Sequence, residues 1–313
     1  MKSKIYGLIL SMVCAMGLSA QVVITDSIPS VRGYDVKLTT NRTEKNGHNV
    51  YIIGFEGGVP YCLDSAVFKK GVAEFKSKKV VPCGIYAFAL NSNSRPFANF
   101  ILNQQNKFTV DIKDENSSEF QKVTVTGSDE NSLFFDFIYN TPNDLKEISR
   151  KRMNLLETMP DAFVTKYIMA AYGADPQRLQ NSRSQQELTN TFLKVTDLSE
   201  PRMLYTPIRV PSMVELPIDK EEITECAAII EYVDDIVSRC QAQNIRNFII
   251  SRLFKTLDTH NPDYDPAMVY LYDHFDHSWI EEGSERRIER KINNLKKIIP
   301  GAQIPELVSH DIN

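Results

Sequence analysis

The chain has 313 residues, of which 42% are hydrophobic, and its 36 Lys and Arg against 40 Asp and Glu give a formal net charge of −4. This mildly acidic charge is spread along the chain, which argues against nucleic acid or an anionic membrane as the main partner. The length and the hydrophobic content predict two domains, each with a core of its own.

The N-terminus has the order of a secretory signal peptide. Lys2 and Lys4 precede an apolar run over residues 5–16, and the small-residue segment Leu18-Ser19-Ala20 precedes Gln21. We predict that residues 1–20 are a signal peptide cleaved after Ala20, because the apolar run is too short to span a bilayer. Removal of the two lysines leaves 34 basic and 40 acidic residues, a net charge of −6.

The alternative for this segment is lipidation at Cys14, which is less favoured because Ser11-Met12-Val13 stand where a leucine and small residues are expected. No later stretch is apolar for long enough to cross a membrane. We therefore expect an exported protein that is periplasmic or associated with the cell envelope.

Residues 21–128 are predicted to form a β-sandwich domain. Apolar residues alternate with polar ones in short runs such as 34–38 and 51–55, and Gly57-Gly58 and Lys69–Gly71 supply turns. Because no helical stretch separates these runs, the pattern favours an antiparallel sandwich over an α/β fold.

Residues 129–299 are predicted to form a helical domain. Ser128 and Asp129 can cap its first helix. Residues 223–240 carry one apolar stripe at helical spacing, whereas four prolines between residues 201 and 217 interrupt regular structure. The stripe consists of Ile223, Cys226, Ile230, Val233, Val237 and Cys240. The expected fold class is thus α+β multidomain, an antiparallel β-sandwich followed by an all-α domain.

Four cysteines lie beyond the predicted signal peptide, and none forms a C-x-x-C redox motif. Cys226 and Cys240 are 14 residues apart on one predicted helix, about 21 Å, which is too far for a disulfide and places them in a helix core. Cys62 and Cys83 lie on neighbouring predicted strands, where a disulfide or two separate thiols are both open.

Two histidines, His274 and His277, lie three residues apart beside Asp273 and Asp276, an arrangement that suits zinc. A zinc site needs three or four ligands, and His260 is the one further histidine within reach by sequence. We therefore interpret this segment as a solvated helix end with inward-packing aromatic residues.

The remaining carboxylates have simple structural explanations. Asp263 and Asp265 suit a turn and a helix cap better than a calcium site, and the pairs Asp234-Asp235 and Glu281-Glu282 suit solvated helix positions. The chain also lacks G-x-S-x-G, H-E-x-x-H, Walker and dinucleotide-binding motifs. The sequence thus predicts no catalytic, cofactor or metal site and no enzyme activity.

Residues 34–140 resemble the N-terminal domain of unknown function that precedes thioredoxin-like modules in many exported Gram-negative proteins. The resemblance is carried by three stretches, which are Asp64–Phe75, Pro82–Phe88 and Val125–Asn131. Residues 145–299 resemble a second, helical domain found next in such chains, through the runs Thr196–Pro207 and Tyr270–Ile280.

In those relatives the third module is similar to TlpA/ResA-type thiol–disulfide oxidoreductases. Gly301, Pro305 and Asp311 look like the opening of that module, so residues 300–313 are interpreted as the start of a truncated thioredoxin-like domain, with a simple tail as the alternative. The resemblance implies a non-catalytic accessory module that binds protein partners in the cell envelope beside such an oxidoreductase. It carries no catalytic residue over to this chain.

The second hypothesis from sequence is an envelope protein that binds a small molecule or a glycan, with Tyr61, Tyr86 and Trp279 as stacking candidates. These aromatic residues are more simply explained as members of a hydrophobic core. The oligomeric state, the orientation of the domains and the redox state of Cys62 and Cys83 stay open at this stage.

Overall fold

The fold was analysed in a computed structural model, which describes residues 28–41, 45–91, 96–114, 121–141, 144–172, 193–208, 225–258 and 262–298, together with residue 190. The predicted signal peptide, residues 1–20, and the segment 300–313 lie outside the described residues. The described residues fall into two compact units, one up to Met169 together with Arg202–Ile208, and the other from Ala170 to Pro201 and beyond Arg209.

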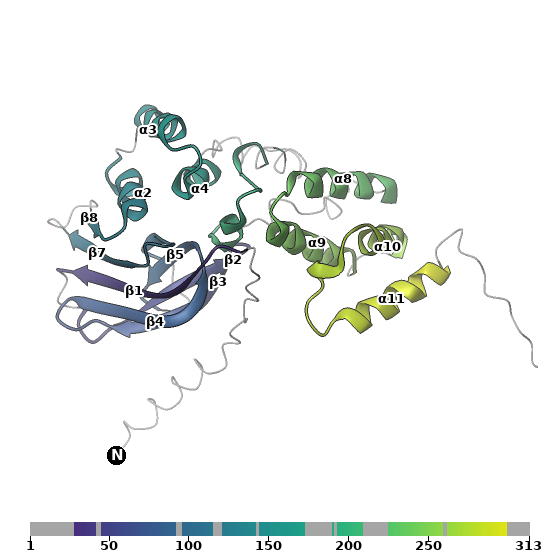
Figure 1. Cartoon of the computed structure of the whole chain (residues 1–313), viewed down its shortest axis with the longest axis horizontal. Coiled ribbons are helices and arrows are strands. Elements are labelled where there is room, and N and C mark those ends of the chain that lie inside the picture. The colour runs from purple at the N-terminus through teal and green to yellow at the C-terminus, as the bar shows by residue number, and fades with distance from the viewer. Residues whose placement is uncertain are drawn as a thin grey trace, which may run out of the picture. The chain divides into compact units, whose positions relative to one another are not determined.

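The first unit is built on two four-stranded sheets. In strand order, one is β4-β1-β7-β8 and the other is β3-β2-β5-β6 (Figure 1). The strands are β1 (Ser30–Thr40), β2 (Asn49–Glu56), β3 (Val59–Val67), β4 (Val72–Pro82), β5 (Gly84–Ala89), β6 (Ala98–Leu102), β7 (Lys107–Asp114) and β8 (Gln121–Thr126).

The predicted sandwich followed by helices is confirmed, with one difference in strand direction. β1 and β7 run parallel, with Val36 beside Phe108 and Leu38 beside Val110, whereas every other pairing between the described strands is antiparallel. Alternation of apolar residues cannot reveal this, because it sets which face a residue occupies and not which strand lies next to it.

The core between the sheets is rich in aromatic rings. Phe75 on β4 and Phe88 on β5 have ring centroids 5.8 Å apart, Phe88 and Phe100 on β6 are 4.5 Å apart, and Phe100 and Phe108 on β7 are 5.8 Å apart. All four rings are at most 5% exposed. The chain of contacts crosses from one sheet to the other and back, so these rings hold the sandwich together.

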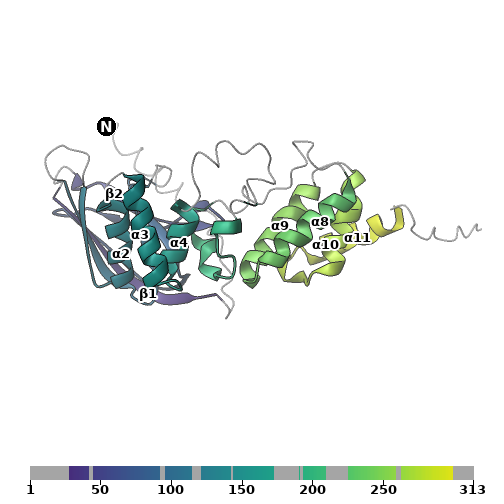
Figure 2. The same cartoon turned by 90° about the horizontal axis from the view of Figure 1, so that it is seen from above.

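Three helices complete the first unit: α2 (Asp129–Tyr139), α3 (Leu145–Thr158) and α4 (Phe163–Tyr172). As predicted, Ser128 is the N-cap of α2, and its hydroxyl accepts from the backbone N–H of Asn131. α2, α3 and α4 lie side by side (Figure 2), joined by the edge-to-face pair of Phe134 and Tyr167 and by the ion pair of Lys151 and Asp136. The change from strand to helix falls at residue 128, but these helices belong to the same compact unit as the sheets.

A 3-10 helix, η2 (Pro201–Tyr205), packs against the second sheet. The backbone N–H of Gly57 donates to the carbonyl of Leu204 at 2.7 Å, and the guanidinium of Arg202 lies 4.5 Å from the ring centroid of Phe163. Met203, Leu204 and Tyr205 are fully buried. The described part of this proline-rich stretch, residues 201–208, is therefore closely packed although it forms no α-helix.

Gly84 on β5 makes the close approach of η2 possible. A Cβ atom added there would lie 2.3 Å from the carbonyl oxygen and 2.7 Å from the Cβ of Tyr205, so the backbones would have to separate. We expect Gly84→Ala to lower the free energy of unfolding by about 1–3 kcal/mol. Urea denaturation followed by circular dichroism would measure this loss, and a variant as stable as the wild type would show that η2 does not pack here.

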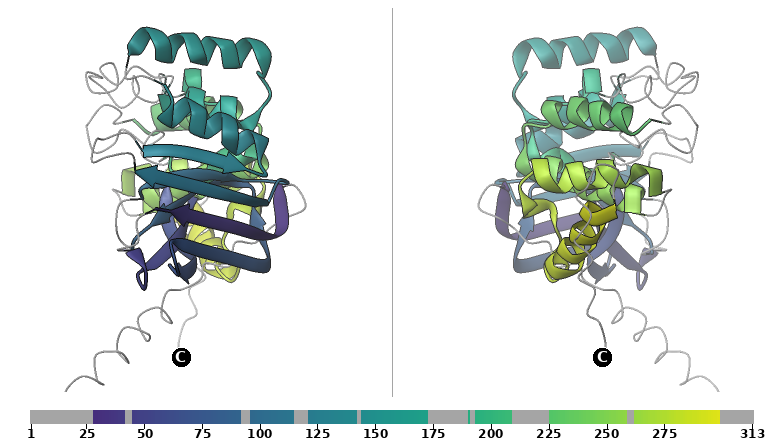
Figure 3. Two further views of the ribbon diagram at one scale, coloured as in Figure 1. Left: turned by 90° about the vertical axis from the view of Figure 1, so that its left-hand side faces the viewer. Right: turned by 90° about the vertical axis from the view of Figure 1, so that its right-hand side faces the viewer.

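The second unit is helical in its described residues. Its helices are α8 (Cys226–Arg239), α9 (Gln243–Asp258), α10 (Asp265–His274) and α11 (Glu285–Ile298), with the short 3-10 helices η3 (Pro262–Tyr264) and η4 (His277–Trp279). α10 contacts α8, α9 and α11, and these green and yellow helices lie nearest the viewer in the right panel of Figure 3.

The buried face of α8 differs slightly from the predicted stripe. Val233 and Val237 are buried as expected, but Ile229 and Ile236 are buried instead of Ile230, which is half-buried. The reason is that two neighbouring apolar residues, such as Ile229 and Ile230, fit the periodic pattern almost equally well. No helix in the described part of the chain is long and apolar enough to cross a membrane.

Candidate functional site

The four edge strands of the sandwich, β3, β4, β6 and β8, differ in how their outer edges are covered or protected. β6 and β8 lie on the side where α2 packs, and α2 contacts both of them (left panel of Figure 3). The side chain of Asn131 on α2 hydrogen-bonds to the outer backbone edge of β6. It accepts from the N–H of Ile101 at 2.6 Å and donates to the Ile101 carbonyl at 2.7 Å. The edge groups of β6 at Ile101 are thus satisfied in the way that a further strand would satisfy them.

The β4 edge carries features that protect an edge strand from unwanted pairing. Lys76, Lys78 and Lys79 are exposed along it, and its pairing with β1 shifts register opposite Gly33. Gly33 has a φ of +80°, and a Cβ there would lie 2.4 Å from the carbonyl oxygen of Ser77. Lysines and a bulge on an edge strand both discourage the addition of another strand.

The β3 edge has fewer of these features. β3 is the terminal strand of its sheet, is mostly exposed, and contains no lysine or arginine. Val59 is 61% exposed and Val67 is 42% exposed. Its single charged residue, Asp64, accepts from the hydroxyl of Tyr34 at 2.9 Å and from the N–H of Ser65, so this carboxylate is used within the fold.

Tyr61 on β3 packs inward against its own sheet. Its ring covers Gly54 so closely that a Cβ on Gly54 would lie 2.4 Å from the ring. Burial raises the pKa of the Tyr61 hydroxyl to about 12. Of the residues 61–67 that follow Pro60, those that reach solvent are small or aliphatic, as at Cys62, Ser65 and Val67.

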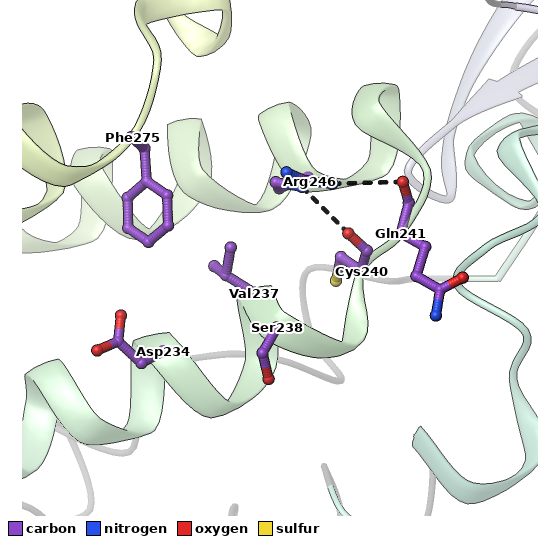
Figure 4. Close-up of a pocket in the computed structure, with 7 residues that line it drawn as sticks. All are labelled: Asp234, Val237, Ser238, Cys240, Gln241, Arg246 and Phe275. Atoms are coloured by element: carbon purple, nitrogen blue, oxygen red, sulfur yellow. Dashed lines mark hydrogen bonds between the residues drawn. The ribbon is translucent and has the colours of Figure 1, made fainter.

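The helical unit contains a separate cavity of about 390 Å³ (Figure 4). It lies between α8, the start of α9 and the end of α10, and is lined by Asp234, Val237, Ser238, Cys240, Gln241, Arg246 and Phe275. The guanidinium of Arg246 donates to the carbonyl oxygens of Cys240 at 3.1 Å and Gln241 at 3.3 Å, and so caps the C-terminal end of α8.

Two other polar groups of this cavity are also occupied. Asp234 accepts from the Tyr270 hydroxyl at 2.6 Å, and the thiol of Cys240 donates to the Ile236 carbonyl at 3.2 Å. Burial raises the pKa of the Cys240 thiol from 9.0 to about 12. A thiol with so high a pKa is a poor nucleophile, so the cavity has no ready catalytic group at Cys240.

Cys240 should consequently resist alkylation. The pKa of the Cys240 thiol is higher in the folded than in the unfolded protein, so its contribution to the free energy of unfolding is fully present below about pH 9. This contribution is lost as the pH rises towards 12. We expect iodoacetamide at pH 8 to modify the exposed Cys62 quickly and Cys240 only after unfolding in urea. Peptide mass spectrometry over time would follow both sites, and equal rates in the native protein would contradict the burial of Cys240.

The structure holds Cys62 and Cys83 as thiols rather than as a disulfide. Cys62 pairs with Ile53 across β2 and β3, whereas Cys83 immediately precedes β5, and β2 lies between these two strands. Cys83 is buried, and its N–H donates to the Pro29 carbonyl at 2.7 Å. Cys226 is half-buried at the start of α8, where burial raises its pKa.

The histidines lie at the exposed end of α10. A ring nitrogen of His274 lies 3.0 Å from the Tyr270 carbonyl, and a ring nitrogen of His277 lies 3.1 Å from the Tyr272 carbonyl. Each imidazole also stacks on the tyrosine whose carbonyl it contacts, with centroids 3.9 and 4.1 Å apart. His260 lies outside the described residues, among which no cluster of three possible metal ligands occurs.

The carboxylates singled out from the sequence take structural roles where their partners are seen. Asp235 pairs with Arg239 at 2.9 Å, and Glu281 pairs with Lys255. Asp265 is the first residue of α10 rather than its cap, since the N-cap position is Tyr264. Asp263 and Glu282 are exposed.

Two of the three aromatic stacking candidates are core residues. Tyr86 is 0% exposed and its hydroxyl donates to the Pro82 carbonyl at 2.8 Å, and Trp279 is 4% exposed and packs on Phe254 at a centroid distance of 4.9 Å. Neither presents a face to a sugar, so the glycan-stacking interpretation of these two residues is wrong. Tyr86 lies in the apolar run 85–90, where burial is the simpler expectation, whereas Trp279 has mostly polar neighbours in sequence and is buried by its contact with Phe254.

Residues 34–134 match the family model described as Domain of unknown function (DUF4369). The match begins in β1 and ends in α2, so it takes in both sheets together with Ser128 and Asn131. The match thus covers most of the sandwich and the first turns of the helix that packs on it. A comparison with curated proteins finds no match to this chain.

Proposed function

We propose that this chain is a non-catalytic interaction module of the cell envelope, which binds a protein partner through the β3 edge of its sandwich. The observation that carries the proposal is the difference between the sandwich edges. α2 packs beside β6 and β8, lysines and a bulge guard β4, and β3 keeps an accessible, weakly charged edge. An edge strand of this kind is a common place for a partner to dock.

The wider setting of this proposal rests on sequence. The N-terminal segment has the features of an exported chain, and residues 34–140 resemble domains that precede thioredoxin-like modules. We therefore place the module beside a TlpA/ResA-like thiol–disulfide oxidoreductase that supplies the C-x-x-C motif this chain lacks. The DUF4369 match assigns no activity by itself.

Site-specific photocrosslinking tests the partner-binding role. A benzophenone amino acid at Ser65 on β3 should yield a discrete crosslinked protein in cells of the source organism. The same group at Asn154, an exposed position on α3, serves as the matched control. A Ser65 pattern no different from that of Asn154 would contradict docking at β3.

An activity assay tests the non-catalytic part. The purified chain should not accelerate the reduction of insulin by dithiothreitol. Measurable turnover that disappears in Cys62→Ser would overturn the proposal, because Cys62 is an exposed thiol on the same strand.

A second candidate function is the binding of a small molecule in the cavity of the helical unit. Its volume of about 390 Å³ lies within the range of ligand sites, and Val237 and Phe275 give it an apolar wall. Native mass spectrometry of the purified chain should then show a bound small molecule that Val237→Trp excludes.

A further inference from the structure

Four exposed lysines lie in the turn and the strand that follow β3. Lys69 and Lys70 form the turn that follows β3, and Lys78 and Lys79 lie in the bulged part of β4. All four are exposed, and none makes an ion pair with another residue in the described part of the chain. They differ from Lys76, which lies 3.8 Å from Asp35 and 3.7 Å from Glu74.

The two lysine pairs take different positions relative to β3. The hydroxyl of Tyr34 on β1 bonds Asp64, near the middle of β3, and it also interacts with Ser77, which directly precedes Lys78. Lys78 and Lys79 therefore follow a residue that lies near the middle of β3, whereas Lys69 and Lys70 follow the last residue of β3. The eight-residue separation of Lys70 from Lys78 corresponds to about 26 Å of extended chain.

The local charge is opposite in sign to that of the chain. Residues 59–82 contain five lysines and two acidic residues, a net charge of +3, whereas the whole chain has a net charge of −4. The two acidic residues, Asp64 and Glu74, are already bonded, to Tyr34 and to Lys37 and Lys76. Within the described part of the chain, Lys69, Lys70, Lys78 and Lys79 therefore form a basic rim in which no lysine is paired with an acidic side chain.

We propose that the β3 edge accepts an extended acidic segment of another polypeptide as an added strand, with carboxylates of that segment paired to Lys69, Lys70, Lys78 and Lys79. This inference rests on the proposed partner-binding function and names the chemical class of the partner. Backbone hydrogen bonds of an added strand give affinity for any sequence, and the rim selects for acidic residues near the two ends.

The same rim disfavours a second copy of this chain as the occupant. Antiparallel pairing of β3 with β3 would bring the basic turn of one copy towards the lysines on β4 of the other. Like charges placed together weaken such a contact. Pro60, which has no N–H to donate, and the register shift near Leu63 reduce the backbone hydrogen bonds that an added strand can make with the first half of β3.

A designed peptide tests the proposal with the full exported chain. The probe is a fluorescent ten-residue peptide with two aspartates, six alternating threonines and valines, and two further aspartates. We expect saturable binding by fluorescence anisotropy that weakens with added salt. K78E/K79E should weaken binding by roughly tenfold or more, whereas K146E/K297E, which makes the same charge change at exposed helix positions, should not.

Two further measurements locate the peptide. N-methylation of alternate peptide amides should abolish binding, because it removes the N–H groups of the added strand. The bound peptide should also slow the alkylation of Cys62 on β3 without changing that of Cys226.

The outcomes separate this inference from the proposed function. Four results would each overturn the acidic-strand proposal. They are no binding of the acidic peptide, equal binding of a lysine-flanked peptide, full binding to K78E/K79E, and a salt-stable dimer held by β3. If the Ser65 crosslink persists in K78E/K79E, the partner-binding function stands and the charge class is wrong. If the peptide binds but no crosslink forms in cells, the β3 edge can bind an acidic strand, but the proposed partner-binding function in cells is wrong.

Discussion

Replacing Phe100 by alanine is expected to lower the free energy of unfolding of the sandwich by about 3–5 kcal/mol. The ring is 0% exposed and lies between Phe88 at 4.5 Å and Phe108 at 5.8 Å, so it connects one sheet to the other. Its removal leaves a void that neighbouring rings can fill only by leaving their own contacts. Urea denaturation followed by circular dichroism would measure the loss.

A matched substitution separates the core role of Phe100 from a general loss of aromatic surface. Phe97 also stacks on Phe88, at 6.2 Å, but it is only half-buried. We expect Phe97→Ala to cost less than half as much as Phe100→Ala, since less apolar area is removed from the core. Equal losses would show that the rings between the sheets do not form the main support of the sandwich.

The sequence was informative about which segments are strands and which are helices, because the spacing of apolar residues differs between a strand and a helix. The runs around Val36, Ile53 and Phe75 became strands, and Ser128 became the cap of α2 as predicted. What the pattern could not give was the neighbour of each strand. The parallel pair β1–β7 joins segments about 70 residues apart, and no local signal specifies such a pairing.

The candidate site was predictable only in part for the same reason. An exposed edge depends on which strands end up outermost, so β3 could not be singled out from its own residues. Lys78 and Lys79 were visible in the sequence, but the nearness of the preceding Ser77 to β3 follows from the contacts of Tyr34 with Ser77 and Asp64, which lie on different sheets. Asn131 was part of a segment that resembles a known domain, yet its role appears only when β6 is placed next to α2.

Asn131 supports the fold through hydrogen bonds rather than through volume. It is 0% exposed, and its amide satisfies both backbone groups of Ile101, while its NH2 also donates to the Ser128 hydroxyl at 3.0 Å. Asn131→Leu keeps a similar size but leaves the N–H and carbonyl of Ile101 buried without partners. We expect a loss of about 3 kcal/mol or more, since each unsatisfied buried group costs about 1–3 kcal/mol.

Asn131→Asp gives the sharper test, because it makes the loss depend on pH. An ionised carboxylate can accept from the Ile101 N–H but cannot donate to the Ile101 carbonyl, and burial disfavours its charge, so the folded-state pKa should rise. Protonation restores the missing donor. The variant should therefore be closest to the wild type at pH 4, and the gap should widen as the pH rises through the raised pKa.

Urea denaturation of both proteins between pH 4 and pH 7.5 would follow this gap, with Asn154→Asp on the exposed face of α3 as the matched control. The control should track the wild type at every pH. A gap for Asn131→Asp that stays constant with pH would mean that the donor to Ile101 is not needed. The β6 edge would then be held by the packing of α2 alone, and the contrast between its edge and that of β3 would rest on burial rather than on hydrogen bonding.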